Sequence, residues 1–206
     1  MSDKVIVFDL GKVIFDYDLS IIANSLSEYS SEKNLFNNME EFMLSNENLF
    51  ANYEKGLISS VDFYKKIVEL LFLKDLSFEK FSDIWNNIFT PNQDVIDLII
   101  SLSHRYELAL LSNTNELHFD YLYKRYPDVF YNFKKLHLSY LMNLRKPDSD
   151  IYEQVIKIHN IEPNNMFFTD DNRKNVYSAM FLGIRAYFFK NCSKLIQDLV
   201  SFGIEV

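Results

Sequence analysis

The sequence predicts an α/β protein: a parallel sheet with helices on both faces, and a helical domain inserted after the first strand. Two observations predict it. Short β-like runs alternate with longer helical patterns along most of the chain, but the stretch from about Asp16 to Phe89 shows no convincing strand. We therefore expect a core made of residues 1–15 and 90–206, with residues 16–89 as the inserted domain.

Short apolar runs mark the expected strands of the sheet. They are Val5–Phe8, Glu107–Leu111, Lys135–Leu138, Met166–Thr169 and Arg185–Phe188. Between the later runs, apolar residues recur at helical spacing, as at Ile151, Val155 and Ile156. Parallel strands need crossover connections, which are usually helices, so this alternation favours parallel pairing.

The inserted stretch has two amphipathic stripes, at 61–71 and 78–88, and Ser59 and Asp62 have the spacing of a capping box. A helical block of this length is too long for an ordinary crossover between two strands. We interpret its aromatic residues as the core of a helical bundle.

Composition excludes several classes of protein. A net charge of −8 disfavours binding to the nucleic-acid backbone, which requires a basic face. Cys192 is the sole cysteine, which rules out internal disulfides and cysteine-rich zinc sites and fits a reducing compartment. No apolar run approaches the length of about 18 residues that a membrane span needs. The expected location is therefore the cytoplasm.

Polar residues follow the expected strands in a fixed order. Asp9 ends the first run, Ser112 ends the second, Lys146 precedes a helix, and Asp170 and Asp171 end a later run. Ligands bind at the carboxyl ends of parallel strands, so these residues are candidates for a site. Each also has an ordinary explanation as a turn, a helix cap or a solvated lysine. Two acids beside Asp9 would suit Mg²⁺.

The order of these motifs resembles the haloacid dehalogenase-like hydrolase superfamily over essentially the whole chain. The segments FDLGKVIFDYD, LLSNTNELH, RKPDSDIY and FFTDDNRKN are similar to the subgroup that contains α-D-glucose-1-phosphate phosphatase. The resemblance implies a Rossmann-like core with a helical cap inserted after the first strand.

The resemblance also implies roles for the motif residues. Asp9 would be the nucleophile that forms an aspartyl-phosphate, and Lys146, Ser112 and Asn113 would contact the phosphate. Mg²⁺ would be bound by Asp9, by the backbone carbonyl of Gly11 and by Asp171, with Asp170 as a direct ligand or as support for one. Asn175 falls where many relatives carry a further acid. Elementary electrostatics supports the grouping, because a carboxylate that attacks a phosphate dianion needs positive charge beside it.

Gly11 departs from the superfamily pattern. Most phosphatases of the superfamily carry Asp there, which protonates the leaving oxygen and later activates water, and losing a general acid costs about 10²–10⁴-fold in rate. We therefore expect esters whose leaving group needs little protonation, such as sugar 1-phosphates, acyl phosphates and p-nitrophenyl phosphate. The expected function is Mg²⁺-dependent hydrolysis of a small phosphorylated metabolite, a sugar phosphate, by a monomer or homodimer with no nucleic-acid or membrane partner.

Other polar residues stay open at this point. For His118 we favour an exposed helix face over the alternative that it faces the site and replaces the missing proton donor. We expect Lys12 in solvent, and Asp16 and Asp18 near the hinge, where either fixes the linker or reaches the pocket. Residues 53–55 form a polar turn that contacts a sugar or joins cap to core.

Two other functions remain. A 2-haloacid dehalogenase also uses an aspartate nucleophile, but the chain lacks the tyrosine typical of that branch after Asp9 and keeps two acids of a metal site. A phospholigand-binding protein that has lost catalysis at Gly11 is the other alternative.

Overall fold

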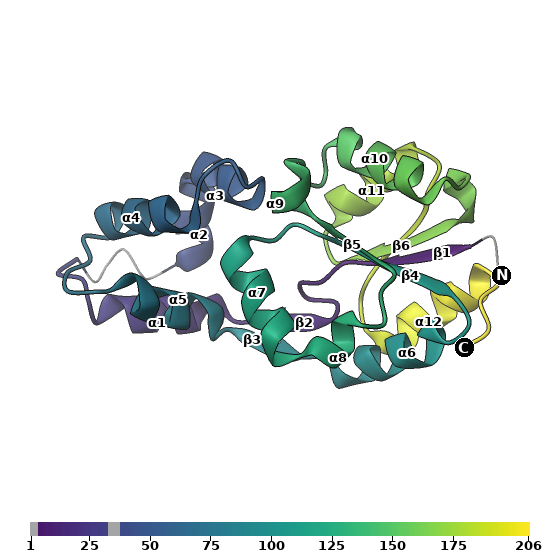
Figure 1. Ribbon diagram of the computed structural model, residues 1–206, viewed down its shortest axis with the longest axis horizontal. Coiled ribbons are helices and arrows are strands. Elements are labelled where there is room, and N and C mark those ends of the chain that lie inside the picture. Colours follow the sequence, from purple (N-terminus) through teal and green to yellow (C-terminus); the bar gives the residue numbers. More distant parts are fainter. Residues whose placement is uncertain (1–3, 33–37) are drawn as a thin grey trace.

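A parallel five-stranded sheet lies at the centre of the α/β core in the computed structural model, which describes residues 4–32 and 38–206. The strand order is β5-β4-β1-β6-β7, and every neighbouring pair is parallel (Figure 1). The strands are β1 (Val5–Phe8), β4 (Glu107–Ser112), β5 (Lys135–Leu138), β6 (Met166–Asp170) and β7 (Arg185–Phe188). The predicted α/β fold is confirmed.

Helices cover both faces of this sheet because its strands are apolar on both sides. Ile6 and Phe8 of β1 belong to one hydrophobic cluster, and Val5 and Val7 belong to another. The first cluster includes residues of α6 (Gln93–Ser103), α7 (Glu116–Arg125), α8 (Pro127–Phe130) and α12 (Cys192–Ser201). The second includes residues of α10 (Ser149–His159) and α11 (Arg173–Phe181). The short α9 (Ser139–Met142) follows β5, and a 3-10 turn, η2 (Pro163–Asn165), precedes β6.

A separate group of helices extends beyond the sheet, and we call it the helical unit (Figure 1). It comprises α1 (Leu19–Ser27), α2 (Met39–Ser45), α3 (Glu47–Glu54), α4 (Ser60–Leu70) and α5 (Phe78–Asn86). Its own hydrophobic cluster buries the predicted aromatic stripes, with Phe63 and Phe81 fully inaccessible. Ser59 caps α4 by accepting a hydrogen bond from the backbone N–H of Asp62 at 3.1 Å. We propose that this unit is a domain with the bounds 16–89.

The prediction that the inserted stretch lacks strands is wrong at its two ends. Strand β2 (Phe15–Tyr17) pairs in antiparallel fashion with β3 (Phe89–Pro91), and the two connect the helical unit to the core. Strands this short have no readable alternation, and their partners are distant in sequence. Two core strands also extend one residue beyond prediction, because Ser112 and Asp170 each pair with a neighbouring strand.

Polar contacts fasten the helical unit to the core. Lys55 forms an ion pair with Asp148 at 3.1 Å, and the Asn143 side chain donates to the Lys55 carbonyl at 2.9 Å. Gly56 has a φ of 67°, and a Cβ added there would lie 2.2 Å from the Tyr140 carbonyl oxygen. Only glycine therefore permits this close approach of the two parts.

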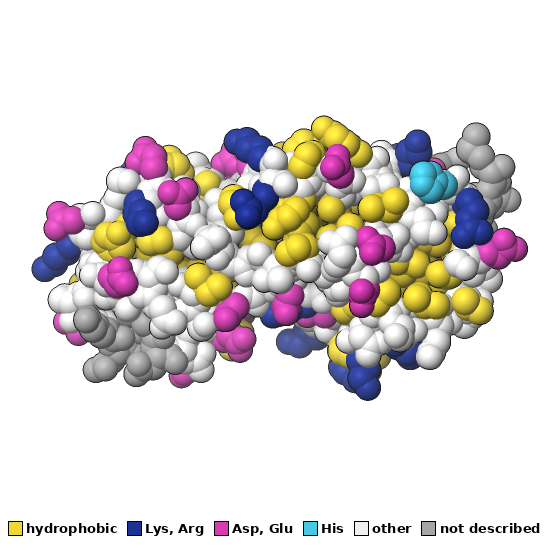
Figure 2. All heavy atoms as spheres, turned by 90° about the horizontal axis from the view of Figure 1, so that it is seen from below, with side chains coloured by type: hydrophobic (Ala, Val, Ile, Leu, Met, Phe, Trp, Pro, Cys, Tyr) yellow, Lys and Arg dark blue, Asp and Glu magenta, His cyan; other side chains and the backbone are white. Residues whose placement is uncertain are grey.

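The face opposite α10 and α11 is mixed in character. Lys and Arg side chains lie scattered among acidic, hydrophobic and neutral ones (Figure 2). Within residues 4–32 and 38–206, no helix combines the length and the apolarity that a bilayer span requires.

Candidate active site

The sheet topology brings the candidate carboxylates together. The chain order reverses at β1, which has β4 on one side and β6 on the other. Asp9 follows β1 and Asp170 ends β6, so both lie at the crevice where ligands bind in open parallel sheets. The Asp9 backbone N–H donates to the Thr169 carbonyl at 3.0 Å, which continues the strand pairing up to the carboxylate.

Lys146 lies between these two carboxylates. Its Nζ is 2.7 Å from Asp9 Oδ1, 2.7 Å from Asp170 Oδ2 and 2.8 Å from the Leu111 carbonyl oxygen. The side chain is 1% exposed, so the ammonium group has exchanged water for these three acceptors. The lysine is therefore a buried positive charge directed at Asp9, and the alternative of a solvated surface lysine is wrong.

The electrostatics of the site show a shortage of positive charge. Burial raises the pKa of Asp9 to about 7. The positive charge of Lys146 lowers this pKa, whereas the negative charges of Asp170 and Asp171 raise it further. Burial opposes the charge of Lys146, but the carboxylates of Asp170 and Asp9 outweigh it and raise the pKa of the lysine. Burial also raises the pKa of Asp171, helped by Asp170. One lysine does not neutralise three carboxylates.

A hard cation would supply the missing charge. Each of Asp9, Asp170 and Asp171 offers a carboxylate oxygen, and these oxygens lie within 4.8 Å of one another. Asp170 is held in place, because the Asn175 amide donates to both of its oxygens at 3.0 Å. The backbone N–H of Asn172 also donates to Asp170 Oδ1, at 2.8 Å. Three convergent oxygens fit Mg²⁺ or a similar ion.

Asn113 supports the lysine instead of pointing its amide at a ligand. Its Nδ2 donates to the Lys146 carbonyl and its Oδ1 accepts from the Lys146 N–H, both at 2.8 Å. The Asn113 amide is therefore already engaged, and a phosphate contact from this residue would have to come from its backbone N–H. Ser112 ends β4 and lines the pocket beside Gly11. Neither residue caps α7, because Asn115 does so by accepting from the His118 N–H at 3.1 Å.

An aromatic ring lies where a side chain at position 11 would begin. A Cβ on Gly11 would be 3.2 Å from Cε1 of Tyr17. Burial raises the pKa of Tyr17 to about 12, and the charges of Asp171 and Asp9 add to the effect. A side chain at position 11 would therefore begin in tight contact with this ring, which would have to shift by a few tenths of an ångström.

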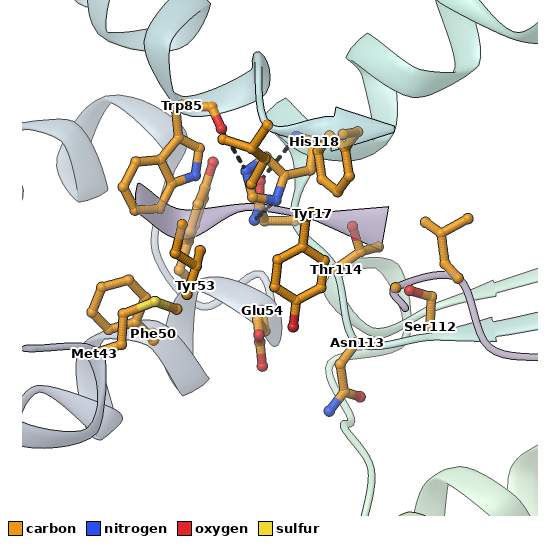
Figure 3. A pocket seen from close by; sticks show the side chains of 16 residues that line it. Tyr17, Met43, Phe50, Tyr53, Glu54, Trp85, Ser112, Asn113, Thr114 and His118 are labelled. Carbon is orange, nitrogen blue, oxygen red and sulfur yellow. Dashed lines mark hydrogen bonds between the residues drawn. The ribbon is translucent and has the colours of Figure 1, made fainter. Parts of the chain in front are cut away.

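A pocket of about 150 Å³ opens from this point toward the helical unit (Figure 3). Its core side is formed by residues at the carboxyl ends of β1 and β4, among them Gly11, Ser112 and Asn113. Its other side is apolar and aromatic. The remaining lining residues are Leu10, Tyr17, Leu19, Met43, Phe50, Tyr53, Glu54, Trp85, Ile88, Phe89, Thr114, Asn115 and His118.

His118 lines this pocket, so the expectation of an exposed helix face is wrong. Its imidazole stacks on the Trp85 ring with centroids 5.9 Å apart, and its Nε2 lies 3.1 Å from the Trp85 carbonyl oxygen. Desolvation lowers the pKa of His118 to about 4, so the ring is neutral near pH 7. A neutral imidazole that is already hydrogen-bonded serves here as a wall of the pocket.

The residues near the hinge have structural partners. Lys12 Nζ is 2.6 Å from Asp16 Oδ1 and 2.6 Å from the Tyr17 carbonyl, so this lysine is not merely solvated. Asp16 thereby fixes the linker, and Asp18 caps α1 by accepting from the Ser20 N–H at 2.9 Å.

Residues 53–55 do not form a turn, because the first two complete α3. Tyr53 and Glu54 line the pocket, while Lys55 joins the helical unit to the core. Glu54 also joins the helical unit to the core, since its carboxylate is 3.0 Å from Nη2 of Arg145.

Two pocket residues had no signal in the sequence. Tyr17 reaches Gly11 only because β2 folds back beside the turn that follows β1, and the Trp85 indole belongs to a stripe that the sequence assigns to the bundle core. Both positions depend on contacts between the two parts of the molecule.

Comparison with known proteins identifies the family. The model of the haloacid dehalogenase-like hydrolase family matches residues 13–189, a match that begins just after Asp9. D-ribitol-5-phosphate phosphatase from Bacteroides thetaiotaomicron is 26% identical over 216 residues, which cover 95% of this chain and 96% of that protein.

Solved structures agree with this assignment. A family enzyme from B. thetaiotaomicron, in complex with magnesium and inorganic phosphate, is 31% identical with a TM-score of 0.81, covering 91% of this chain and 94% of the other. The L-2-haloacid dehalogenase of Xanthobacter autotrophicus shares the fold, with 19% identity and a TM-score of 0.64 over 98% of this chain and 84% of that one. The chain belongs to the haloacid dehalogenase-like hydrolase family.

Proposed function

We propose that the protein is a Mg²⁺-dependent phosphatase that hydrolyses small phosphate monoesters through an aspartyl-phosphate on Asp9. One observation carries this proposal: Lys146 Nζ lies 2.7 Å from Asp9 and 2.7 Å from Asp170, at the crevice between β1 and β6. A buried ammonium group between two carboxylates is suited to a site where an anion meets a second anion. The magnesium and phosphate bound to the B. thetaiotaomicron family enzyme lend further support.

The proposed roles follow from charge. At about 4 Å and an effective dielectric constant of about 20, two unit charges repel by roughly 4 kcal/mol, and a phosphate dianion roughly doubles this cost. Lys146 offsets part of it by contacting a phosphate oxygen, and the Ser112 hydroxyl and the Asn113 N–H hold the other oxygens. Mg²⁺ would be held by Asp9, Asp171 and the backbone carbonyl of Gly11. Asp170 would bind the ion directly or support one of its ligands. The ion would supply positive charge to the phosphoryl group.

Gly11 restricts which esters react quickly. A glycine donates no side-chain proton to the leaving oxygen, so the leaving group must depart without that help. An anomeric hydroxyl is more acidic than a primary alcohol, which favours sugar 1-phosphates over sugar 6-phosphates. This reasoning, together with the shared motif segments, supports placement in the glucose-1-phosphate phosphatase-like subgroup. The ribitol phosphatase relative is named for a primary 5-phosphate, so the two assignments make opposite predictions.

A phosphate-release assay tests the function and the preference together. We expect turnover of p-nitrophenyl phosphate with Mg²⁺, its loss in EDTA, and its loss in Asp9→Asn. Asp62→Asn, on the exposed surface of α4, is the matched control and should retain activity. We expect glucose 1-phosphate to exceed glucose 6-phosphate by at least about tenfold in kcat/KM. A preference for the 6-phosphate would contradict the role given to Gly11.

The alternative function is binding of a phosphorylated ligand at the same site without its hydrolysis. Lys146 and the carboxylates would serve a phospholigand-binding protein as well as an enzyme. The side chain that Gly11 lacks is the usual proton donor, which only turnover requires. Such a protein would gain thermal stability from a phosphate ester but release no phosphate. Release that depends on Asp9 rules this reading out.

A further inference from the structure

The unpaired polar groups of the described residues concentrate at the pocket. Four buried side-chain atoms in that part of the chain lack a hydrogen-bond partner: Glu54 Oε2, Trp85 Nε1, Asn86 Oδ1 and Arg145 Nε. Glu54 and Trp85 line the pocket, and Arg145 lies 3.0 Å from Glu54. Buried polar atoms in folded proteins almost always have a partner. These exceptions therefore mark the pocket as a place where the polar groups of a ligand complete the pairing.

Two hydroxyl groups add to this set. Tyr17 and Thr114 line the pocket, and neither hydroxyl makes a hydrogen bond to another described residue. A hydroxyl can donate one hydrogen bond and accept two. The pocket thus combines an acceptor at Glu54, a donor at Trp85 and two groups that can act as either.

Glu54 is the charged member of the set. Its ion pair with Arg145 holds the carboxylate in place, but the geometry of that contact leaves Oε2 without a hydrogen bond. Figure 3 shows the side chain in the pocket. Burial raises the pKa of Tyr17, and the negative charge of Glu54 raises it further, so these two side chains are close enough to interact. Hydrogen bonds to an ionised carboxylate are roughly twice as strong as those between neutral groups. Glu54 is therefore the acceptor from which a ligand hydroxyl gains most.

A leaving group with several hydroxyls matches these groups. Each ligand hydroxyl both donates and accepts, so one set of hydroxyls can pair with Glu54, with the Trp85 N–H and with the two protein hydroxyls. The rest of the lining is mainly apolar and aromatic, which suits the carbon skeleton of such a ligand. A hydrocarbon leaving group would leave these polar groups unpaired, and an anionic one would be repelled by Glu54.

We propose that Glu54 determines specificity by accepting a hydrogen bond from a hydroxyl of a polyhydroxylated leaving group, a sugar or a sugar alcohol. Trp85 Nε1 and the hydroxyls of Tyr17 and Thr114 pair with other oxygens of that group. This inference rests on the proposed phosphatase function and deepens it. The acidity of the leaving oxygen favours sugar 1-phosphates in the chemical step, whereas Glu54 favours polyhydroxylated esters in binding.

Binding without turnover tests this preference. The Asp9→Asn variant with Mg²⁺ is titrated by calorimetry with two matched pairs of esters: glucose 1-phosphate against cyclohexyl phosphate, and sorbitol 6-phosphate against n-hexyl phosphate. Burial raises the pKa of Glu54 against the opposing charges of Arg145 and Lys146, so the titrations are run at about pH 8.

We expect the hydroxylated ester of at least one pair to bind at least about tenfold tighter than its hydrocarbon match. The pair with the larger ratio distinguishes a sugar ring from an open-chain sugar alcohol. Ratios below about tenfold in both pairs overturn the proposal.

Glu54→Met tests the carboxylate itself. In the Asp9→Asn background, we expect this substitution to weaken binding of the preferred hydroxylated ester by about tenfold or more, because a hydrogen bond to a charged acceptor is lost. Its hydrocarbon match should bind as before or more tightly, because the pocket becomes more apolar. Equal losses for the two esters, or no loss for the hydroxylated one, overturn the role of Glu54.

Two further variants control for the loss of a carboxylate and for the loss of the ion pair. Glu69→Met removes an exposed carboxylate that pairs with Lys66 on α4, and it should change the binding of neither ester. Arg145→Lys disturbs the ion pair with Glu54 but keeps the carboxylate and a positive charge beside it, so the preference should remain. If Arg145→Lys abolishes the preference as fully as Glu54→Met, the ion pair explains the effect and the assignment fails.

Wild-type turnover separates this inference from the proposed function. If the binding preference holds but no ester releases phosphate, the phosphatase function fails and the role of Glu54 stands. If phosphate is released and hydroxylated esters bind no better than their hydrocarbon matches, the role of Glu54 fails and the function stands.

Discussion

The two sides of the pocket differ in how completely their polar groups are satisfied. At the strand ends next to the pocket, Lys146 has three acceptors and Asp170 receives hydrogen bonds at both oxygens. On the side of the helical unit, the indole N–H of Trp85 has no partner. The charged groups at the strand ends are fixed by their own contacts, whereas the helical side of the pocket is mostly aromatic and leaves the indole N–H of Trp85 unpaired.

This difference suggests that one group of residues carries out the reaction and the other determines which esters are preferred. The core side comes from the ends of parallel strands, whose positions are set by sheet pairing. The aromatic side comes mainly from helices and from the short β2–β3 pair, none of which belongs to the five-stranded sheet. A change on the core side should therefore alter turnover of every ester, whereas a change on the aromatic side should alter the ranking of esters.

The largest expected effect comes from Lys146→Met. Removing the ammonium group leaves the carboxylates of Asp9 and Asp170 buried together, which costs about 3–5 kcal/mol of stability. We expect kcat/KM to fall by at least about 10³ for every ester, since the positive charge beside the nucleophile is lost. Urea unfolding and phosphate release measure the two effects.

Lys66→Met, on the exposed surface of α4, is the matched control for that substitution. A Lys146→Met protein that loses activity toward one ester only would contradict the division between the two sides.

A smaller effect on kcat/KM is expected from substitutions at Gly11 and Tyr17, which are in contact where the core meets the helical unit. Gly11→Asp alone should lower activity, because its Cβ would lie 3.2 Å from the Tyr17 ring. Gly11→Asp/Tyr17→Ala makes room for a carboxyl group that can donate a proton. We expect it to raise kcat/KM for glucose 6-phosphate relative to glucose 1-phosphate by about tenfold or more. An unchanged ratio would mean that Gly11 does not set the preference.

The contact between the helical unit and the core is tested by a pair of glycines. Gly56→Ala places a Cβ 2.2 Å from the Tyr140 carbonyl oxygen, whereas Gly183→Ala meets only Pro163 Cβ at 3.5 Å. Both glycines have positive φ, so backbone strain of about 1–2 kcal/mol is common to the two variants. The additional loss of stability in Gly56→Ala therefore measures the clash.

Denaturant unfolding of both variants gives that difference. Equal losses would show that the helical unit does not depend on this close approach.

The smallest effect concerns pH and His118. The unfolded chain takes up a proton near pH 6.5, but the folded protein keeps the ring neutral down to about 4, so stability falls as pH drops below about 6.5. At pH 5 this group should cost about 2 kcal/mol relative to neutral pH. His118→Gln should lose less stability on acidification, as followed by urea unfolding at the two pH values. Parallel pH profiles for the two proteins would contradict the burial of a neutral ring.

Local patterns were enough to predict the sheet. The bounds of β5 and β7 match the apolar runs, and β4 and β6 extend one residue further because register, not hydrophobicity, sets their ends. The motif order also indicated which side chains would meet, because parallel strands bring their carboxyl ends to one edge. Geometry then added that Lys146 contacts both Asp9 and Asp170.

The aromatic side was not predictable in the same way. His118 lies on a helix whose pattern gives no reason to bury it, and the rings of Trp85 and Phe89, distant in sequence, pack against it. The Asn113 amide binds the Lys146 backbone from a distant loop. Such contacts depend on the docking of segments far apart in sequence, which no local pattern records.

A covalent phosphate on Asp9 tests the central claim most directly. Because Gly11 supplies no base to activate water, the aspartyl-phosphate should break down slowly and accumulate during turnover. Rapid acid quench of the enzyme with Mg²⁺ and p-nitrophenyl phosphate, followed by mass spectrometry, should find the phosphoryl group on the peptide that contains Asp9, after a burst of p-nitrophenol. Turnover that proceeds with no burst and no phosphorylated Asp9 would contradict the account.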